Sequence, residues 1–233
     1  MESIKKNISF SSKEYKRMAL DYSLNDLEPI IFFRSIFFHY ELIHKNYETK
    51  LNELIHNIEF SEEDYEKFNS LEKLISNIEY FPEHLKDDVG FLSRGLFNHN
   101  FFFANITSAK NGGKESEKKI NPTLLGKIEE TFSGLENLKK KIIYESLSLI
   151  GSGWTWLVIN EEEMLEVINT QNEDNPLSLN LKPILSIDVW EHSYYLDYGF
   201  NRKEYVEKVL NCLINWEKVD NLHTKYSFQP QNQ

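Results

Sequence analysis

The spacing of apolar residues predicts helices in the first half of the chain. Between residues 27 and 60 apolar side chains recur every three or four positions, the period of an amphipathic helix. Asn25 or Asp26 can cap its start, and Pro29 suits a first turn. A short helix is predicted from Ser61. Residues 87–108 form another, which is apolar almost all round near its centre and is therefore expected to be buried.

The pattern changes in the second half. The Gly-rich, charged segment 110–122 ends in proline and predicts a domain boundary. A helical pattern over 124–150 follows. Three strand patterns then begin near residues 151, 161 and 181, and a helical pattern returns over 204–216. We therefore predict the α+β class. The expected division is a flexible extension (1–16), a helical domain (17–112), an α/β domain (113–221) and a polar tail (222–233).

Composition and charge exclude several classes of protein. A chain of 233 residues can bury a substantial core. It contains no apolar run of about 18 residues, so no membrane span is predicted. A net charge of −11 argues against non-specific nucleic-acid binding. The start of the chain lacks a secretory pattern, and the lone Cys212 fits a reducing compartment; we therefore expect a cytoplasmic protein.

Candidate chemistry begins with Asp188 and His192, which are four residues apart where a predicted strand ends. A carboxylate and an imidazole at this spacing can bind one Fe or Mn ion. His39 and His99 lie on apolar helical faces, where a lone histidine is more often an ordinary core residue. A metal would offset the cost of a buried aspartate and keep the imidazoles neutral. The other histidines are expected at the surface: His44, His56, His84 and His223.

Four motifs carry a family resemblance and occur in that family's order. They are H-Y-x-x-x-H-x-x-Y at 39–47, N-H-x-x-F at 98–102, G-S-G-W-T-W-L-V at 151–158 and D-V-W-E-H-S-Y-Y at 188–195. Over roughly Leu20 to Val219 the chain resembles iron/manganese superoxide dismutases. The resemblance implies an N-terminal helical hairpin domain followed by a C-terminal α/β domain with a small three-stranded antiparallel sheet.

The resemblance also implies an activity and a ligand set. It implies one-electron ping-pong conversion of superoxide to dioxygen and hydrogen peroxide, at one Fe or Mn ion per chain. The implied ligands are His39, His99, Asp188 and His192. Further implied roles are Tyr47 at the substrate funnel, Trp154 and Trp190 as walls of the metal pocket, and Arg202 as the cation that steers superoxide. A homodimer is implied through Tyr195 and through Glu191, which would reach the partner's His192.

The chain departs from the family pattern at four positions. Ile43 replaces a histidine of the funnel, and Phe103 replaces a tryptophan. The family places a glutamine over the metal-bound solvent from one of two positions, which here hold Gly95 and Glu173. We expect Glu173 to turn inward, where an ionised carboxylate could only accept a hydrogen bond and a protonated one could donate.

These departures leave two questions open. The positions of Gly95 and Glu173 favour manganese, whereas Ser186 and Ile187 before the aspartate are closer to iron-type members, so the metal is not settled. The alternative function is a metal-binding but weakly active or inactive relative, with a structural or metal-holding role. Ile43 and Glu173 motivate that alternative.

Overall fold

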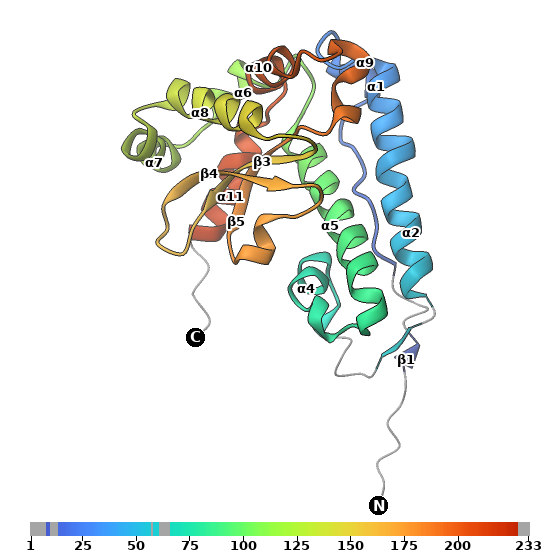
Figure 1. Ribbon diagram of the computed structural model, residues 1–233. Helices are drawn as coiled ribbons and strands as arrows, with labels where there is room; N and C mark the ends of the chain where they lie inside the picture. The colour runs from blue at the N-terminus through green and yellow to red at the C-terminus, as the bar shows by residue number, and fades with distance from the viewer. Residues whose placement is uncertain (1–7, 10–13, 57, 61–65, 228–233) are drawn as a thin grey trace, which may run out of the picture.

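The computed structural model describes residues 8–9, 14–56, 58–60 and 66–227 (Figure 1). A helical half contains α1, η3, α2, α4, η4 and α5, and a mixed half contains a small sheet surrounded by helices. The helices of the first half are η2 (Leu24–Leu27), α1 (Phe33–Phe37), η3 (Phe38–His44), α2 (Lys45–Ile55), α4 (Leu71–Ser76), η4 (Ile78–Tyr80) and α5 (Glu83–Asn105). The two-residue strands β1 (Ile8–Ser9) and β2 (Glu59–Phe60) pair antiparallel.

The hairpin consists of the continuous run α1–η3–α2 lying along α5 (Figure 1). Tyr47, Leu51 and Ile55 on α2 share a core cluster with Val89 and Leu96 on α5, as the apolar periodicity predicts. The helix begins later than the pattern predicts, because the chain first forms the short turn η2. Ser23 precedes that turn, and its backbone N–H donates to Asp26 at 2.9 Å.

The second half contains the predicted three-stranded antiparallel sheet, in the order β4–β3–β5. Its strands are β3 (Gly153–Ile159), β4 (Leu165–Gln171) and β5 (Lys182–Asp188). The central strand β3 is buried along its whole length. Its register places Trp154 opposite Thr170 on one side and Asp188 on the other. The sheet therefore brings two predicted site residues to the same end.

Helices of this half lie above and behind the sheet in the view of Figure 1. They are α6 (Lys114–Glu117), α7 (Pro122–Phe132), α8 (Leu135–Ser148), η5 (Pro176–Leu179), η6 (Glu191–Ser193), α9 (Tyr195–Tyr198), α10 (Arg202–Cys212) and α11 (Trp216–Ser227). No helix within the described ranges is both long and apolar enough to cross a bilayer.

Some predicted boundaries differ from the structure. The single helix expected over 124–150 is two helices, because Ser133 adopts a left-handed conformation (φ +57°) and Gly134 follows it. The helix expected over 204–216 ends at Cys212, and α11 begins at Trp216 and continues to Ser227. The predicted tail thus begins inside α11. Most of the predicted N-terminal extension, the start of the short helix from Ser61, and residues 228–233 lie outside the described residues.

Candidate metal centre

Four elements bring the predicted ligands together. His39 comes from η3, His99 from α5, Asp188 from the end of β5 and His192 from η6. One ligand atom from each lies within 4.8 Å of the others. Oδ2 of Asp188 is 3.1 Å from Nε2 of His39 and 3.3 Å from Nε2 of His192. Ligand residues from both halves of the chain therefore meet at one point, as the family resemblance implies.

Two local hydrogen bonds orient these ligands. The backbone N–H of Trp190 donates to Oδ1 of Asp188 at 2.8 Å, which leaves Oδ2 facing the imidazoles. Nδ1 of His99 lies 2.7 Å from the backbone carbonyl oxygen of Gly95. A carbonyl can only accept, so Nδ1 carries the proton and the lone pair of Nε2 is free to bind a metal.

The electrostatics of the group suit a cation. Burial lowers the pKa of His39 and, more strongly, that of His99, so both imidazoles are neutral at pH 7. Burial would raise the pKa of Asp188, but the adjacent His192 and His39 hold it well below its usual range. The centre thus combines neutral nitrogen donors with an ionised carboxylate.

The same four ligand atoms are suited to binding a metal ion. Four of the buried side-chain atoms that lack a hydrogen-bond partner in the described part of the chain face this point: Nε2 of His39, His99 and His192, and Oδ2 of Asp188. Leaving such groups buried and unsatisfied is costly. Three imidazoles and one carboxylate are ligands that Fe and Mn accept. An ion bound at this point would satisfy all four atoms together.

Aromatic rings surround the four ligands. The Trp154 ring meets His99 edge-on at 5.1 Å between centroids, and the Trp190 ring stacks on His192 at 5.6 Å. Phe103 meets His39 at 4.9 Å. Trp154 and Phe103 are fully buried. These three rings, two of which the family resemblance implies as walls of the metal pocket, restrict water around the ligand atoms.

Glu173 lies inward and is fully buried. Its Oε1 accepts a hydrogen bond of 2.8 Å from the hydroxyl of Tyr47. Its Oε2 accepts from Nδ2 of Asn98 at 3.0 Å and from Nε1 of Trp154 at 3.1 Å. Burial raises the pKa of Glu173 to about 8, although the three hydrogen bonds oppose the shift. The carboxyl group is therefore mainly protonated at pH 7 and becomes ionised as the pH rises through about 8.

Gly95 makes room for Tyr47. A Cβ atom at position 95 would lie 2.3 Å from Cε1 of Tyr47, far inside van der Waals contact. Any side chain here would displace the phenol that binds Glu173. A glutamine at position 95 is therefore incompatible with this placement of Tyr47. The side chain that binds the Tyr47 hydroxyl comes instead from position 173.

Comparisons with known proteins agree with this geometry. The profile of the alpha-hairpin domain of iron/manganese superoxide dismutases matches residues 14–107, and that of their C-terminal domain matches residues 120–222. The chain belongs to the iron/manganese superoxide dismutase family. Relatives named superoxide dismutase [Mn/Fe] 2, from Staphylococcus aureus strains Mu50 and N315, are 35% identical over 209 residues. These matches cover 90% of this chain and 97% of each relative.

Four further residues that the resemblance assigns to the superoxide dismutase site lie outside the group of four ligands. Glu191 is the first residue of η6 and Tyr195 the first residue of α9, and both are exposed. Ile43 is partly buried and packs against the cluster that contains Tyr47. Arg202 begins α10 and directs its guanidinium at backbone carbonyl oxygens and the hydroxyl of Tyr194.

The sequence interpretation did not foresee the contacts of Asn98 or the burial of His44 and His223. Asn98 is fully buried, binds Glu173 and accepts a hydrogen bond of 3.2 Å from Nδ2 of Asn175. The expectation that His44 lies at the surface was wrong. It is fully buried, and its ring stacks on His99 and Phe103. His223 is also buried, against the same expectation, whereas His56 and His84 are exposed.

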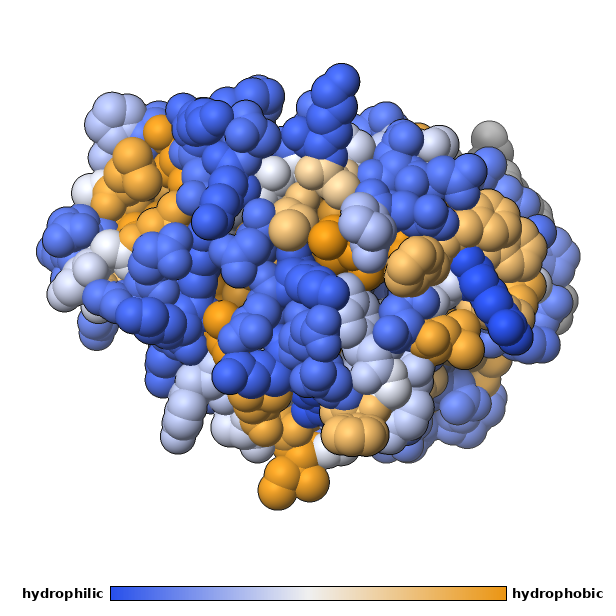
Figure 2. All heavy atoms as spheres, turned by 90° about the horizontal axis from the view of Figure 1, so that it is seen from above, coloured by the Kyte–Doolittle hydropathy of each residue, from blue (hydrophilic) through white to orange (hydrophobic). Residues whose placement is uncertain are grey.

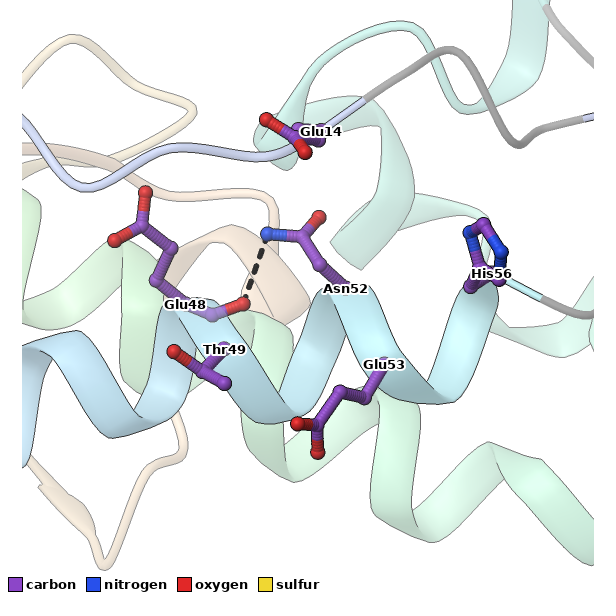
Figure 3. A pocket seen from close by; sticks show the side chains of 6 residues that line it. All are labelled: Glu14, Glu48, Thr49, Asn52, Glu53 and His56. Carbon is purple, nitrogen blue, oxygen red and sulfur yellow. Dashed lines mark hydrogen bonds between the residues drawn. The ribbon is translucent and has the colours of Figure 1, made fainter.

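One cavity lies away from the metal centre, at the far end of α2 (Figure 3). It measures about 670 Å³ and is lined by Glu14, Glu48, Thr49, Asn52, Glu53 and His56. Its carboxylates already have cationic neighbours, since Glu14 lies 3.4 Å from Lys16 and Glu48 lies 3.6 Å from Arg17. We assign it no role in the chemistry.

Proposed function

We propose that this protein converts superoxide to dioxygen and hydrogen peroxide with one Fe or Mn ion per chain. The observation that carries the proposal is the convergence of His39, His99, Asp188 and His192, in a chain of this family, with their ligand atoms within 4.8 Å of one another. The bound ion supplies one-electron redox chemistry by alternating between two oxidation states. No observation favours the alternative of a metal-holding but inactive relative.

The protein contributes a proton-carrying pair, Tyr47 and Glu173. When Glu173 is ionised, the Tyr47 hydroxyl donates to Oε1, as the 2.8 Å contact allows. When Glu173 is protonated, Oε1 can donate to the Tyr47 oxygen, and the Tyr47 O–H becomes free to donate elsewhere. Asn98 and Trp154 keep Oε2 satisfied in both states. We assign this pair the role of holding a proton close to the reacting centre.

The enclosure of the site supports this role. The rings of Trp154 and Phe103 exclude bulk water, and burial raises the pKa of Tyr47 well above its ordinary value. Tyr47 therefore stays protonated across the physiological range, and Glu173 is the member of the pair that can change its charge. A cytoplasmic location, expected from the lone Cys212, stays a prediction.

We also propose that the functional unit is a homodimer. The α1–α9 face is defined here by exposed apolar side chains, with exposed fractions of 49% for Phe32, 46% for Phe33, 38% for Phe37, 47% for Tyr195 and 53% for Leu196. Asp197 joins its two helices, since it accepts from the Phe32 backbone and from the Ser35 hydroxyl. Figure 2, seen from this end, shows apolar side chains gathered at the right, over α1. Such a face favours burial against a second copy.

The activity is tested with protein loaded separately with Mn and with Fe. Elemental analysis should give about one ion per chain, and competition with a superoxide reporter should show dismutation by at least one form. Asp188→Asn is the matched loss-of-ligand variant, and His84→Gln, which changes an exposed histidine, is the control. One equivalent of metal without dismutation in either form would contradict the proposal.

A further inference from the structure

Arg202 connects three segments of the chain through one guanidinium group. Nη1 donates to the carbonyl oxygens of Leu149 at 2.7 Å and Ser146 at 3.3 Å, and Nη2 donates to that of Gly151 at 2.8 Å. Nε donates to the Tyr194 hydroxyl at 3.2 Å. All four acceptors are uncharged oxygens.

The acceptors lie where the chain turns toward the metal centre. Ser146 and Leu149 close the C-terminal end of α8, whose last carbonyls have no partner within the helix. Gly151 occupies a left-handed turn (φ +85°) three residues before Trp154. Tyr194 is two residues after His192 and is itself buried. The group therefore joins the segments that lead to Trp154 and to His192.

The position of Arg202 in its own helix favours a specific role. It is the first residue of α10, after the cap Asn201, whose side chain accepts from the Glu204 backbone at 3.3 Å. A cation at a helix N-terminus is electrostatically unfavourable. The same guanidinium compensates by lying at the C-terminal end of α8, where a cation is favoured. A rigid planar fork can serve several carbonyls together, which a lysine ammonium cannot do as well.

We propose that Arg202 is a positioning residue, which fixes the Gly151–Trp154 turn and the Tyr194 segment and thereby holds Trp154 and His192 in place. This differs from the steering role that the family resemblance implies for Arg202. This role rests on the proposed function, because that function gives the metal site its purpose. The two main measurements, hydrogen exchange and Mn²⁺ affinity, do not require dismutation.

The test compares Arg202→Lys, which keeps the charge but loses the fork, with Arg202→Met, which loses both. Lys203→Met is the matched control, because it removes one charge from an adjacent residue whose only described ion pair is a 3.8 Å contact with Glu207. Hydrogen exchange is measured on metal-free protein, and Mn²⁺ affinity is measured by titration. Both Arg202 variants should show roughly tenfold faster exchange over residues 149–155. Both should bind Mn²⁺ about 10- to 100-fold more weakly, and Lys203→Met should match wild type in both.

A steering role gives the opposite pattern. Arg202→Lys would then match wild type in exchange, Mn²⁺ affinity and rate. Arg202→Met would lose rate only at low ionic strength, where long-range attraction is strongest. That pattern would overturn the proposal.

Tyr194→Phe is a milder variant, which still tests the proposal if Arg202→Met fails to fold. It removes only the acceptor of Nε, so exchange over residues 190–195 should quicken by less than in Arg202→Lys. Unchanged exchange in both Tyr194→Phe and Arg202→Lys would overturn the proposal. If wild type binds Mn²⁺ but lacks dismutase activity, the proposed function fails while the exchange and affinity results still decide the role of Arg202.

Discussion

The Tyr47 hydroxyl donates a 2.8 Å hydrogen bond to Oε1 of Glu173 beside the candidate metal centre. Burial raises the pKa of this carboxyl group from its ordinary 4.5 to about 8. Between these values the folded chain keeps a proton that the unfolded chain releases. The contribution of Glu173 to stability is therefore present below about pH 4.5 and is lost as the pH rises to about 8. The slope is at most about 1.4 kcal/mol per pH unit.

Replacement of Glu173 by Gln removes this titration while keeping a similar shape. We expect the free energy of unfolding of metal-free Glu173→Gln to fall less steeply with pH than that of wild type. The difference should grow in favour of the variant from pH 5 to pH 8. Urea unfolding at several pH values measures it, with far-UV circular dichroism as the signal. Parallel curves for the two proteins would show that Glu173 keeps an ordinary pKa.

Replacement of Tyr47 by Phe removes the donor to Oε1. That hydrogen bond opposes the effect of burial on the pKa of Glu173, so the upper end of the pH window should move above 8. Above this window the lost charge-assisted bond should cost about 1.5–3 kcal/mol. In the Glu173→Gln background the Tyr47→Phe change should cost less. A double-mutant cycle measures the coupling, and strictly additive effects would show that the two residues do not interact.

The family motifs imply the ligand set, and the apolar spacing predicts the helical faces, because both can be recognised from residues close together in the sequence. It misplaces His44 for a physical reason. Residues Phe38–His44 form a π-helix, whose hydrogen bonds join residues five apart. His39 and His44 are five apart, so this local winding brings His44 onto the buried side. A regular α-helical period of 3.6 residues places it elsewhere.

Contacts between distant segments could not be predicted from local pattern. The partners of Glu173 come from three elements, through Tyr47, Asn98 and Trp154. The family motif indicates that position 173 is important, but only the packing shows that Asn98 donates a hydrogen bond to the Glu173 carboxyl group. Arg202 is similar, since its carbonyl acceptors belong to segments more than fifty residues earlier in the chain. The break at Ser133 and Gly134, in contrast, is a local feature that the prediction of a single helix over 124–150 overlooked.

Metal binding should stabilise the folded chain. The ligand atoms of His39, His99, Asp188 and His192 converge only after folding, so Mn²⁺ binds the native state preferentially. At a free concentration one hundred times the dissociation constant, the stabilisation should be about 2.7 kcal/mol. Thermal unfolding with Mn²⁺ and with a chelator measures the effect. Asp188→Asn should lose most of it, and His56→Gln, at an exposed histidine, should retain it. An equal response in the two variants would exclude this site.

Gly95→Ala should destabilise the protein through Tyr47. The added Cβ would lie 2.3 Å from Cε1 of Tyr47, and such overpacking typically costs about 1–3 kcal/mol. Gly126→Ala in α7 is the matched control, because nothing lies within 4 Å of its added Cβ. That exposed helical position should gain about 0.5–1 kcal/mol. Urea unfolding of both variants decides the matter, and equal stability would place Tyr47 away from Gly95.

The proposed homodimer predicts the response to a charge at Tyr195. This residue is 47% exposed, and the charge of Glu191 raises its pKa, so the two side chains are neighbours. A second carboxylate at this point would add like-charge repulsion and would have to be desolvated in the interface. We expect wild type to sediment as a dimer at micromolar concentration and Tyr195→Glu to sediment mainly as a monomer. Tyr144→Glu, at a tyrosine that is 66% exposed on α8, should remain dimeric. A wild-type monomer, or a Tyr195→Glu variant that dimerises as tightly as wild type, would place the contact elsewhere.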